Sequence, residues 1–170
     1  TNGSWNFALF CLLDLKKPVV AAVTGAAVGI GTTLLLHCDL VYADNSAKFQ
    51  LPFVKLALVP EAGASLLLPQ VVGHVKAAEL LMLGESFDAN AALQYGLIND
   101  VIAADDIFDF SLNQAKKLAA QPPISLQATK QLMAYNKEAI RAQMKKELLE
   151  FGARLASDEA KARFAAFLER

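Results

Sequence analysis

An uncharged stretch near the start of the chain most restricts the folds available to it. The twenty-one residues from Pro18 to Cys38 contain no Lys, Arg, Asp or Glu, and about twenty apolar residues are enough to span a bilayer. However, the stretch includes Gly25, Gly29, Gly31 and three threonines, and its first half is β-branched. These residues favour a buried strand followed by a buried helix over a membrane span.

The flanking segments predict alternating helices and strands. A helical pattern over Ser4–Lys17 ends at Pro18, because the residue before proline disfavours the helical region. Val19–Val23 is a continuous apolar run, typical of a strand buried on both faces. Gly31–Cys38 is expected to form a helix. Turn residues then separate two further expected strands, Leu40–Ala43 and Ala47–Leu51.

Helical patterns dominate after Pro60. Val75–Leu83 has helical spacing with a stop at Gly84, Asp88 begins a short helix, and Leu97–Ile102 is expected to form a last strand. The remaining segments are rich in strong helix formers and predict four amphipathic helices: Ile107–Ala120, Pro123–Tyr135, Lys137–Ser157 and Asp158–Arg170. The whole pattern predicts a single α/β domain with a helical C-terminal layer.

Composition limits the partners and the compartment. Hydrophobic residues make up 55% of the chain, above the usual 45–50% or so, which predicts buried subunit interfaces and hence an oligomer. The net charge is -1, so the chain has no excess of positive charge to attract nucleic acid. Cys11 and Cys38 lack metal-site or disulfide spacing. We therefore expect a cytoplasmic protein with no bound metal, no nucleic-acid partner and no membrane association.

A glycine-containing turn is the first candidate for chemistry. In "GAAVGIGTTLLLHC", Gly29 and Gly31 lead into the expected helix, and the free N–H groups of a helix start favour negative charge. The spacing does not match a dinucleotide fingerprint, because Leu34 occupies the third glycine position. The alternative is that these glycines only allow the helix to pack closely on the strand.

Glu61 is the second candidate. It follows Pro60 and is flanked by the apolar segments Leu56–Val59 and Leu66–Leu68. Partial burial would raise the pKa of this carboxyl group toward the range that a general base needs. The alternative is a solvated loop carboxylate. Two other features are read as structural: His37 as a hydrogen-bonded core or interface histidine, and the charged run Arg141–Glu150 as a solvated helix face.

The order of three segments makes the chain recognisable. They are "KPVVAAVTGAAVGIGTTLLLHCDLVYAD", "AKFQLPFVKLALVPEAGASLLLPQVVG" and "AAELLMLGESFDANAALQYGLINDV". From Lys17 to about Val101 the chain resembles the enoyl-CoA hydratase/isomerase (crotonase) superfamily. The resemblance implies a spiral of ββα units in residues 1–102, with residues 103–170 as a helical region that drives trimers or dimers of trimers. It also implies an acyl-CoA thioester substrate and no separate cofactor, since coenzyme A is part of the substrate.

The resemblance also assigns site residues. The second N–H of the family's oxyanion hole, which binds the thioester oxygen, falls on Ile30. Its partner comes from an earlier loop similar to "CAGxD", which is not found before Ser4, so an N-terminal portion is expected to be missing. Substrate contacts are expected from the residues around this turn and around Glu61: Ala27, Gly29, Gly31, Phe53, Leu58, Pro60 and Leu66.

Departures from the hydratase pattern indicate the reaction. Thr33 and Phe53 occupy the positions of the two hydratase glutamates, whereas Glu61 stands where hydratases commonly have glycine. Glu61 in this position resembles the base of the peroxisomal-type delta-3,delta-2-enoyl-CoA isomerases, which use a single glutamate. The expected reaction is therefore isomerisation of 3-enoyl-CoA to 2-enoyl-CoA. Alternatives are another acyl-CoA reaction on the same fold, hydratase-like or hydrolytic, or a silent acyl-CoA-binding scaffold.

Overall fold

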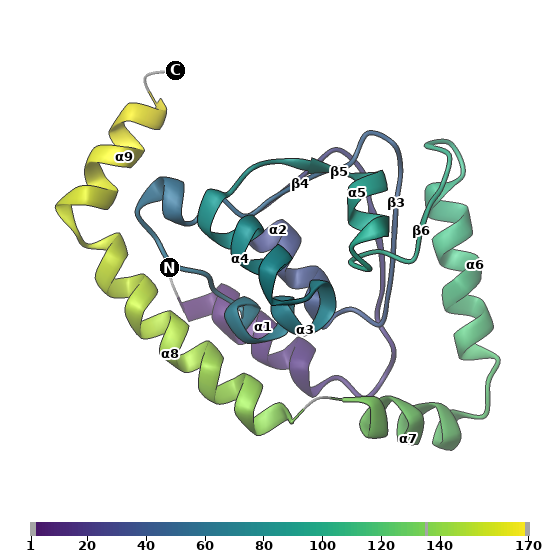
Figure 1. Cartoon of the computed structure of the whole chain (residues 1–170). Coiled ribbons are helices and arrows are strands. Elements are labelled where there is room, and N and C mark those ends of the chain that lie inside the picture. The colour runs from purple at the N-terminus through teal and green to yellow at the C-terminus, as the bar shows by residue number, and fades with distance from the viewer. Residues whose placement is uncertain (1–2, 135, 169–170) are drawn as a thin grey trace.

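The centre of the protein is built from two small sheets (Figure 1). The computed structural model describes residues 3–134 and 136–168. In the first sheet β1 (Val20–Val23), β3 (Leu40–Ala43) and β6 (Asp100–Val101) lie in the order β1-β3-β6, and both pairs are parallel. Parallel neighbours cannot be joined by a tight hairpin, so the chain must cross over between them.

The second sheet also has three strands, and the chain passes back and forth between it and the first sheet. β2 (Ala26–Val28) pairs in parallel with β4 (Lys48–Gln50), and β5 (Phe87–Asp88) adds to β4 in the antiparallel direction. Gly25, at positive φ, turns the chain from β1 into β2. β1 and β3 each lead into a strand of the second sheet, whereas β5 comes before β6. The chain thus winds between the two sheets, as expected for the predicted spiral of ββα units.

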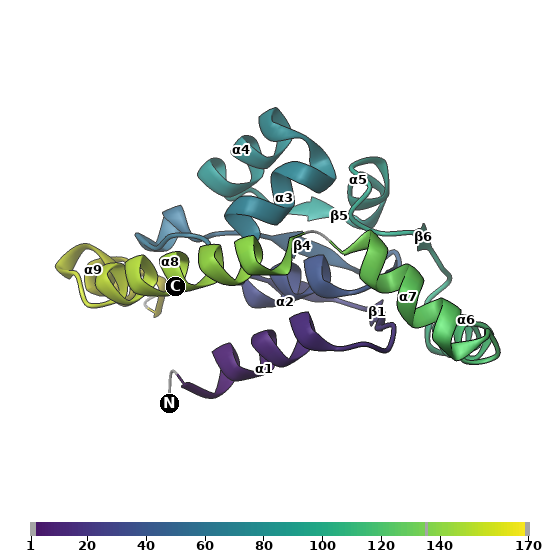
Figure 2. The same ribbon diagram turned by 90° about the horizontal axis from the view of Figure 1, so that it is seen from below.

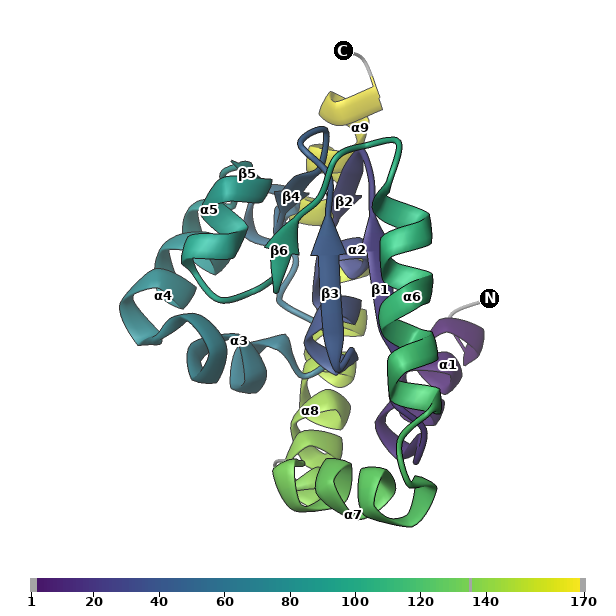
Figure 3. The same cartoon turned by 90° about the vertical axis from the view of Figure 1, so that its right-hand side faces the viewer.

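Helices cover the sheets on several sides. Figure 2 shows α1 on one side of the strands and the pair α3 and α4 on the other, while Figure 3 shows α6 lying along β1. The last three helices, which we call the C-terminal arm, extend around the core (Figure 1). The helices are α1 (Gly3–Asp14), α2 (Ile30–Thr33), α3 (Ala64–Val72), α4 (His74–Leu83), α5 (Ala89–Gln94), α6 (Ile107–Ala119), α7 (Pro123–Met133), α8 (Lys137–Leu155) and α9 (Asp158–Leu168).

Two buried clusters hold these layers together. The larger contains residues of both sheets and of their helices. It includes Phe49, which is fully buried and stacks on Phe87 with ring centroids 5.5 Å apart. The smaller joins α1, the loop before α3, and α8; its buried members are Leu9, Leu13, Ala62, Leu67, Ile140 and Met144. The smaller cluster therefore fixes the Glu61 loop between the first helix and the arm.

Several predicted elements are confirmed and others need correction. Strand Leu40–Ala43 and the helix ending before Gly84 are as expected. The expected helix Gly31–Cys38 is instead α2 followed by the 3-10 helix η1 (Leu34–His37). β1 is only half-buried, because it is an edge strand. β2 and β5 were not anticipated.

The ends of other elements also differ from expectation. The first helix ends at Asp14 rather than Lys17, and the last strand is shorter than Leu97–Ile102. The four C-terminal helices are present, although Tyr135, Glu169 and Arg170 lie outside the described residues. In the described part of the chain, no helix has the length and apolar composition needed to cross a membrane. The uncharged stretch Pro18–Cys38 is divided among short strands and helices.

Candidate active site

The turn before α2 presents a backbone donor. Gly29, with φ 57° and ψ -115°, caps the helix, and its N–H donates to the Gln50 carbonyl oxygen at 2.9 Å. The Thr32 hydroxyl donates to the Ala27 carbonyl oxygen at 2.6 Å and ties the helix to β2. Ile30 is the first helical residue, so the helix itself supplies no acceptor for its N–H. That N–H is suited to bind an oxygen atom that carries negative charge.

The loop that carries Glu61 has an unusual backbone. Ala57, Ala62 and Gly63 all have positive φ values, a conformation that non-glycine residues rarely adopt. His37 Nε2 lies 2.7 Å from the Ala62 carbonyl oxygen and therefore donates to it. Burial lowers the pKa of His37, and this hydrogen bond opposes the shift. His37 is thus a hydrogen-bonded interior histidine, as predicted, and it holds the residue next to Glu61.

The Glu61 carboxylate is half-buried and hydrogen-bonded. Thr33, which is fully buried, donates its hydroxyl hydrogen to Glu61 Oε1 at 2.5 Å. Burial raises the pKa of Glu61 above the ordinary value for a glutamate; the Thr33 hydrogen bond lowers it, and the negative charge of Glu147 raises it. A carboxyl group with a raised pKa can both accept and return a proton near neutral pH.

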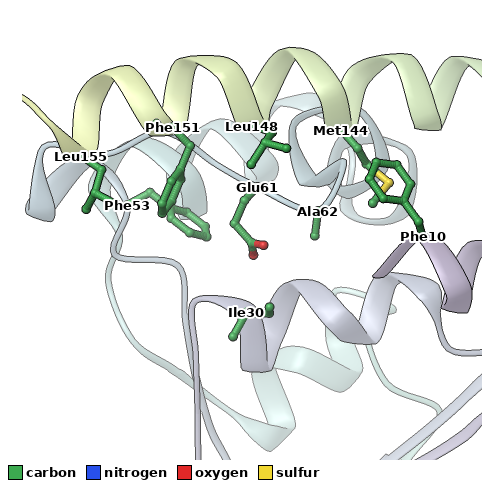
Figure 4. Close-up of a pocket in the computed structure, with 10 residues that line it drawn as sticks. Phe10, Ile30, Phe53, Glu61, Ala62, Met144, Leu148, Phe151 and Leu155 are labelled. Carbon is green, nitrogen blue, oxygen red and sulfur yellow. The ribbon is translucent and has the colours of Figure 1, made fainter. Parts of the chain in front are cut away.

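A cavity of about 320 Å³ surrounds this carboxylate, within the usual size range of small-molecule sites. Figure 4 shows Glu61 extending from its loop beneath α8 toward the segment that carries Ile30. Among the described residues that line the cavity, Glu61 is the one ionisable side chain. The lining residues are Phe10, Ile30, Phe53, Glu61 and Ala62 together with Met144, Leu148, Phe151, Gly152 and Leu155 of α8.

The structure brings together some of the predicted site residues. Glu61, Ile30 and Phe53 line one pocket, and Gly29 and Gly31 form the turn beside it. Ala27 lies buried beneath this turn. The other three expected contacts do not line the pocket: Leu58 packs in the larger core, Leu66 packs against the smaller cluster, and Pro60 precedes the base in its loop.

The arm contributes residues that the sequence analysis missed. Met144, Leu148, Phe151 and Leu155 follow one another at intervals of four, three and four residues, the spacing of one helix face. That spacing could have identified α8 as a wall of an apolar site. The prediction that Arg141–Glu150 is a solvated face is wrong at two positions, since Met144 and Glu147 are only 4% and 5% exposed. Nothing in the local sequence distinguishes Glu147 from its exposed neighbours.

Comparison with known proteins places the chain in a family. The family model described as enoyl-CoA hydratase/isomerase matches residues 6–170. The 2,3-dehydroadipyl-CoA hydratase of Escherichia coli is 37% identical over 94% of this chain and 63% of its own length. Enoyl-CoA delta isomerase 2 of Rattus norvegicus is 36% identical over 93% of this chain and 41% of its own length.

The fold agrees with solved structures. An enoyl-CoA hydratase/isomerase from Pseudoalteromonas atlantica superposes with a TM-score of 0.92 and 44% identity, over 95% of this chain and 65% of that one. The predicted crotonase-like α/β fold is therefore confirmed. In each of these three comparisons the chain spans less than two thirds of its relative. The matched model, the identities and the fold together show that the chain belongs to the enoyl-CoA hydratase/isomerase family.

Proposed function

We propose that the protein converts 3-enoyl-CoA to 2-enoyl-CoA, with Glu61 as the single acid–base group. One observation carries this proposal: an apolar pocket contains one described carboxylate, and that carboxylate lies across from a helix start with an available backbone N–H. A pocket of this composition suits an acyl chain. The thioester is the substrate class of the family to which the chain belongs.

In the proposed reaction Glu61 removes a proton from C2 of the acyl chain. The electron pair of that C–H bond moves toward the thioester carbonyl and leaves negative charge on its oxygen. The Ile30 N–H donates to this oxygen, a type of interaction worth about 3 to 4 kcal/mol in comparable sites. Glu61 then returns the proton to C4, and the double bond is left between C2 and C3.

The surroundings of Glu61 favour this proton shuttle. Burial raises the pKa of Glu61, which makes its carboxylate a stronger base than a solvated one. The Thr33 hydroxyl fixes the direction of Oε1. An apolar cavity also limits the water that could compete for the proton.

Hydration has less support from the same pocket. Adding water needs groups that both activate the water and protonate the α-carbon. Thr33 and Phe53 stand where the resemblance places the two glutamates of hydratases, and neither side chain can act as a base at neutral pH. Glu147 is nearby, but its oxygens accept hydrogen bonds from the start of α3. We therefore favour isomerisation over a hydratase-like or hydrolytic reaction.

Assembly and subunit regions belong to the same proposal. We propose a homotrimer or a dimer of trimers that uses no cofactor beyond the coenzyme A portion of its substrate. Residues 1–102 would form the spiral core and residues 103–170 the oligomerisation region. Exposed apolar side chains on the arm support this division: Ile124 is 84% exposed, Leu132 86% and Leu149 77%.

Glu61→Gln tests the proposed base. The protein is produced with whatever residues its coding sequence places before Thr1 and assayed with 3-enoyl-CoA. We expect kcat to fall by about 10²- to 10⁴-fold, the range for loss of a general base, while acyl-CoA binding is retained. Glu85→Gln is the matched control, because the Glu85 side chain is 74% exposed and pairs with Lys55.

Three outcomes would contradict the proposal. Unchanged turnover in Glu61→Gln would eliminate Glu61 as the base. Formation of 3-hydroxyacyl-CoA from 2-enoyl-CoA, without isomerisation, would indicate a hydratase. Tight acyl-CoA binding with no turnover of any thioester would indicate a silent scaffold.

A further inference from the structure

Glu147 is a buried carboxylate on the arm, far along the chain from Glu61. It lies in α8 within a run of charged residues, yet it is only 5% exposed. Burying a charge is costly unless hydrogen bonds compensate for it. The contacts of Glu147 therefore indicate what it does.

Glu147 accepts hydrogen bonds from the start of α3. Its Oε2 accepts from the Gly63 N–H at 2.5 Å, and its Oε1 accepts from the Ser65 N–H at 2.9 Å and the Ser65 hydroxyl at 2.5 Å. The Gln143 side-chain amide donates to Ser65 Oγ at 2.8 Å, so the Ser65 hydrogen is directed at Glu147. Burial raises the pKa of Glu147, and the hydrogen bonds from Ser65 and Gly63 oppose this shift. Because every one of these neighbours donates, they favour the ionised carboxylate.

This arrangement replaces a local helix cap. Gly63, the residue before α3, has no side chain to accept from the first N–H groups of the helix. Glu147 supplies that acceptor from 84 residues away in the sequence. A negative charge at a helix N-terminus is favourable because the unpaired N–H groups carry partial positive charge.

The capped N–H belongs to the loop that holds the proposed base. Gly63 follows Glu61 by two residues, and the Ala62 carbonyl between them accepts from His37. Three separate elements thus hold this short segment: α2 through Thr33, η1 through His37, and α8 through Glu147. Loss of one of these contacts would let the carboxylate of Glu61 move relative to Ile30.

We propose that Glu147 is a positioning residue for Glu61: it anchors the backbone just after the base and keeps a second negative charge beside it. The inference rests on the proposed role of Glu61. It assigns part of the C-terminal arm to the reaction itself, in addition to any role of the arm in assembly.

The charge of Glu147 affects the pKa of Glu61. The negative charge of Glu147 raises the pKa of Glu61, in the same direction as burial. Among the described residues of the elements packed around the loop, the other polar side chains are Thr33, His37, Ser65 and Gln143. The charged side chains of Arg141 and Lys55 form ion pairs at the surface, with Asp14 and Glu85 respectively. Removing the charge of Glu147 should therefore lower the pKa of Glu61.

The decisive experiment compares Glu147→Gln with Glu150→Gln across pH. A glutamine at position 147 removes the charge and cannot accept from both Gly63 and Ser65. We expect kcat/KM to fall about tenfold or more, because a small misplacement of a catalytic group lowers the rate steeply. The acidic limb of the profile, where Glu61 becomes protonated, should shift to lower pH. Glu150→Gln removes a charge from the same helix, but the Glu150 side chain is 57% exposed. This control should leave kcat/KM and the position of the acidic limb unchanged.

The outcomes separate this inference from the proposed function. If Glu61→Gln abolishes turnover while Glu147→Gln leaves the acidic limb in place, Glu147 is only a structural cap and the inference is overturned. If Glu61→Gln retains turnover, the proposed function itself fails.

A second variant covers the case in which Glu147→Gln does not fold. Ser65→Ala removes one donor to Glu147 and leaves both backbone N–H contacts. Because Ser65 is not among the residues that line the pocket, we expect kcat to fall about fivefold at unchanged KM, the effect of losing roughly one hydrogen bond. A folded Ser65→Ala protein with the original kcat would overturn the inference.

Discussion

The spiral core and the C-terminal arm contribute different components to one pocket. The core supplies the polar groups: Glu61, the Thr33 hydroxyl and the Ile30 N–H. The arm supplies an apolar wall from α8, together with the charge of Glu147 behind the loop. A helical region can therefore line a site even when its sequence indicates only amphipathic helices.

The two regions also differ in how much of their surface is buried. Both regions expose some large apolar side chains, but the largest fully buried ones include Phe49, Leu51 and Leu68 of the core and, among the described residues, none from the arm. The core should therefore hold most of the stability of the isolated chain, and the arm should open at lower free energy.

Phe49→Ala is expected to have the largest effect on stability. The ring is fully buried and stacks on Phe87, so its removal leaves a cavity and should lower the free energy of unfolding by about 3 to 5 kcal/mol. Leu149 on the arm is 77% exposed, so Leu149→Ala should change the free energy of unfolding by about 0.5 kcal/mol or less. Denaturant unfolding of both variants measures the difference. If the two variants lose similar amounts of unfolding free energy, Leu149 must be covered by another subunit.

The sequence pointed to Glu61 and Ile30 more directly than to the residues that surround them in the candidate site. An acidic residue in an apolar loop and a glycine turn before a helix made both segments candidates, and the family resemblance then assigned the roles of Glu61 and Ile30. Local patterns also identified β3 and α4. These features depend on neighbours within a few residues, which a sequence displays directly.

Other features depend on residues that meet only after folding. The strands β2 and β5 contain three and two residues, too few to show a periodic pattern. The pairing of Glu147 with Gly63 joins positions 84 residues apart, and charged neighbours in its helix conceal it. Leu58 and Leu66 were expected near the substrate because they are close to Glu61 in sequence, but their side chains point into packed clusters.

Thr33→Val tests the contribution of the core to the pKa of Glu61. Thr33 from the core lowers the pKa of Glu61, whereas Glu147 from the arm raises it. Valine keeps the shape and removes the donor, so the pKa of Glu61 should rise. Since the active form is the carboxylate, the acidic limb of kcat/KM should move to higher pH, opposite to Glu147→Gln. Activity just below neutral pH should fall about tenfold, the value of a hydrogen bond to a charged group.

Thr32→Val is the matched control for that experiment. It removes a buried hydroxyl from the same short helix, but the Thr32 hydroxyl donates to the Ala27 carbonyl and not to Glu61. The control should lose stability without moving the pH profile. A shift of the limb to lower pH in Thr33→Val would contradict the assigned direction of the hydrogen bond.

Gly152→Ala is expected to have the smallest effect and to act in the opposite direction on stability. Gly152 lies inside α8, and a Cβ atom added there would meet nothing within 4 Å. Alanine favours a helix over glycine by about 0.5 to 1 kcal/mol, so the melting temperature should rise by about 1 to 4 °C. Gly63, on the core side of the same interface, is the contrasting position: φ is 75°, and a Cβ would approach Ile140 and Met144 at 3.3 Å. Thermal melting measures the effect. If Gly152→Ala instead lowers the melting temperature, the space beside Gly152 must be occupied by another subunit in the assembled protein.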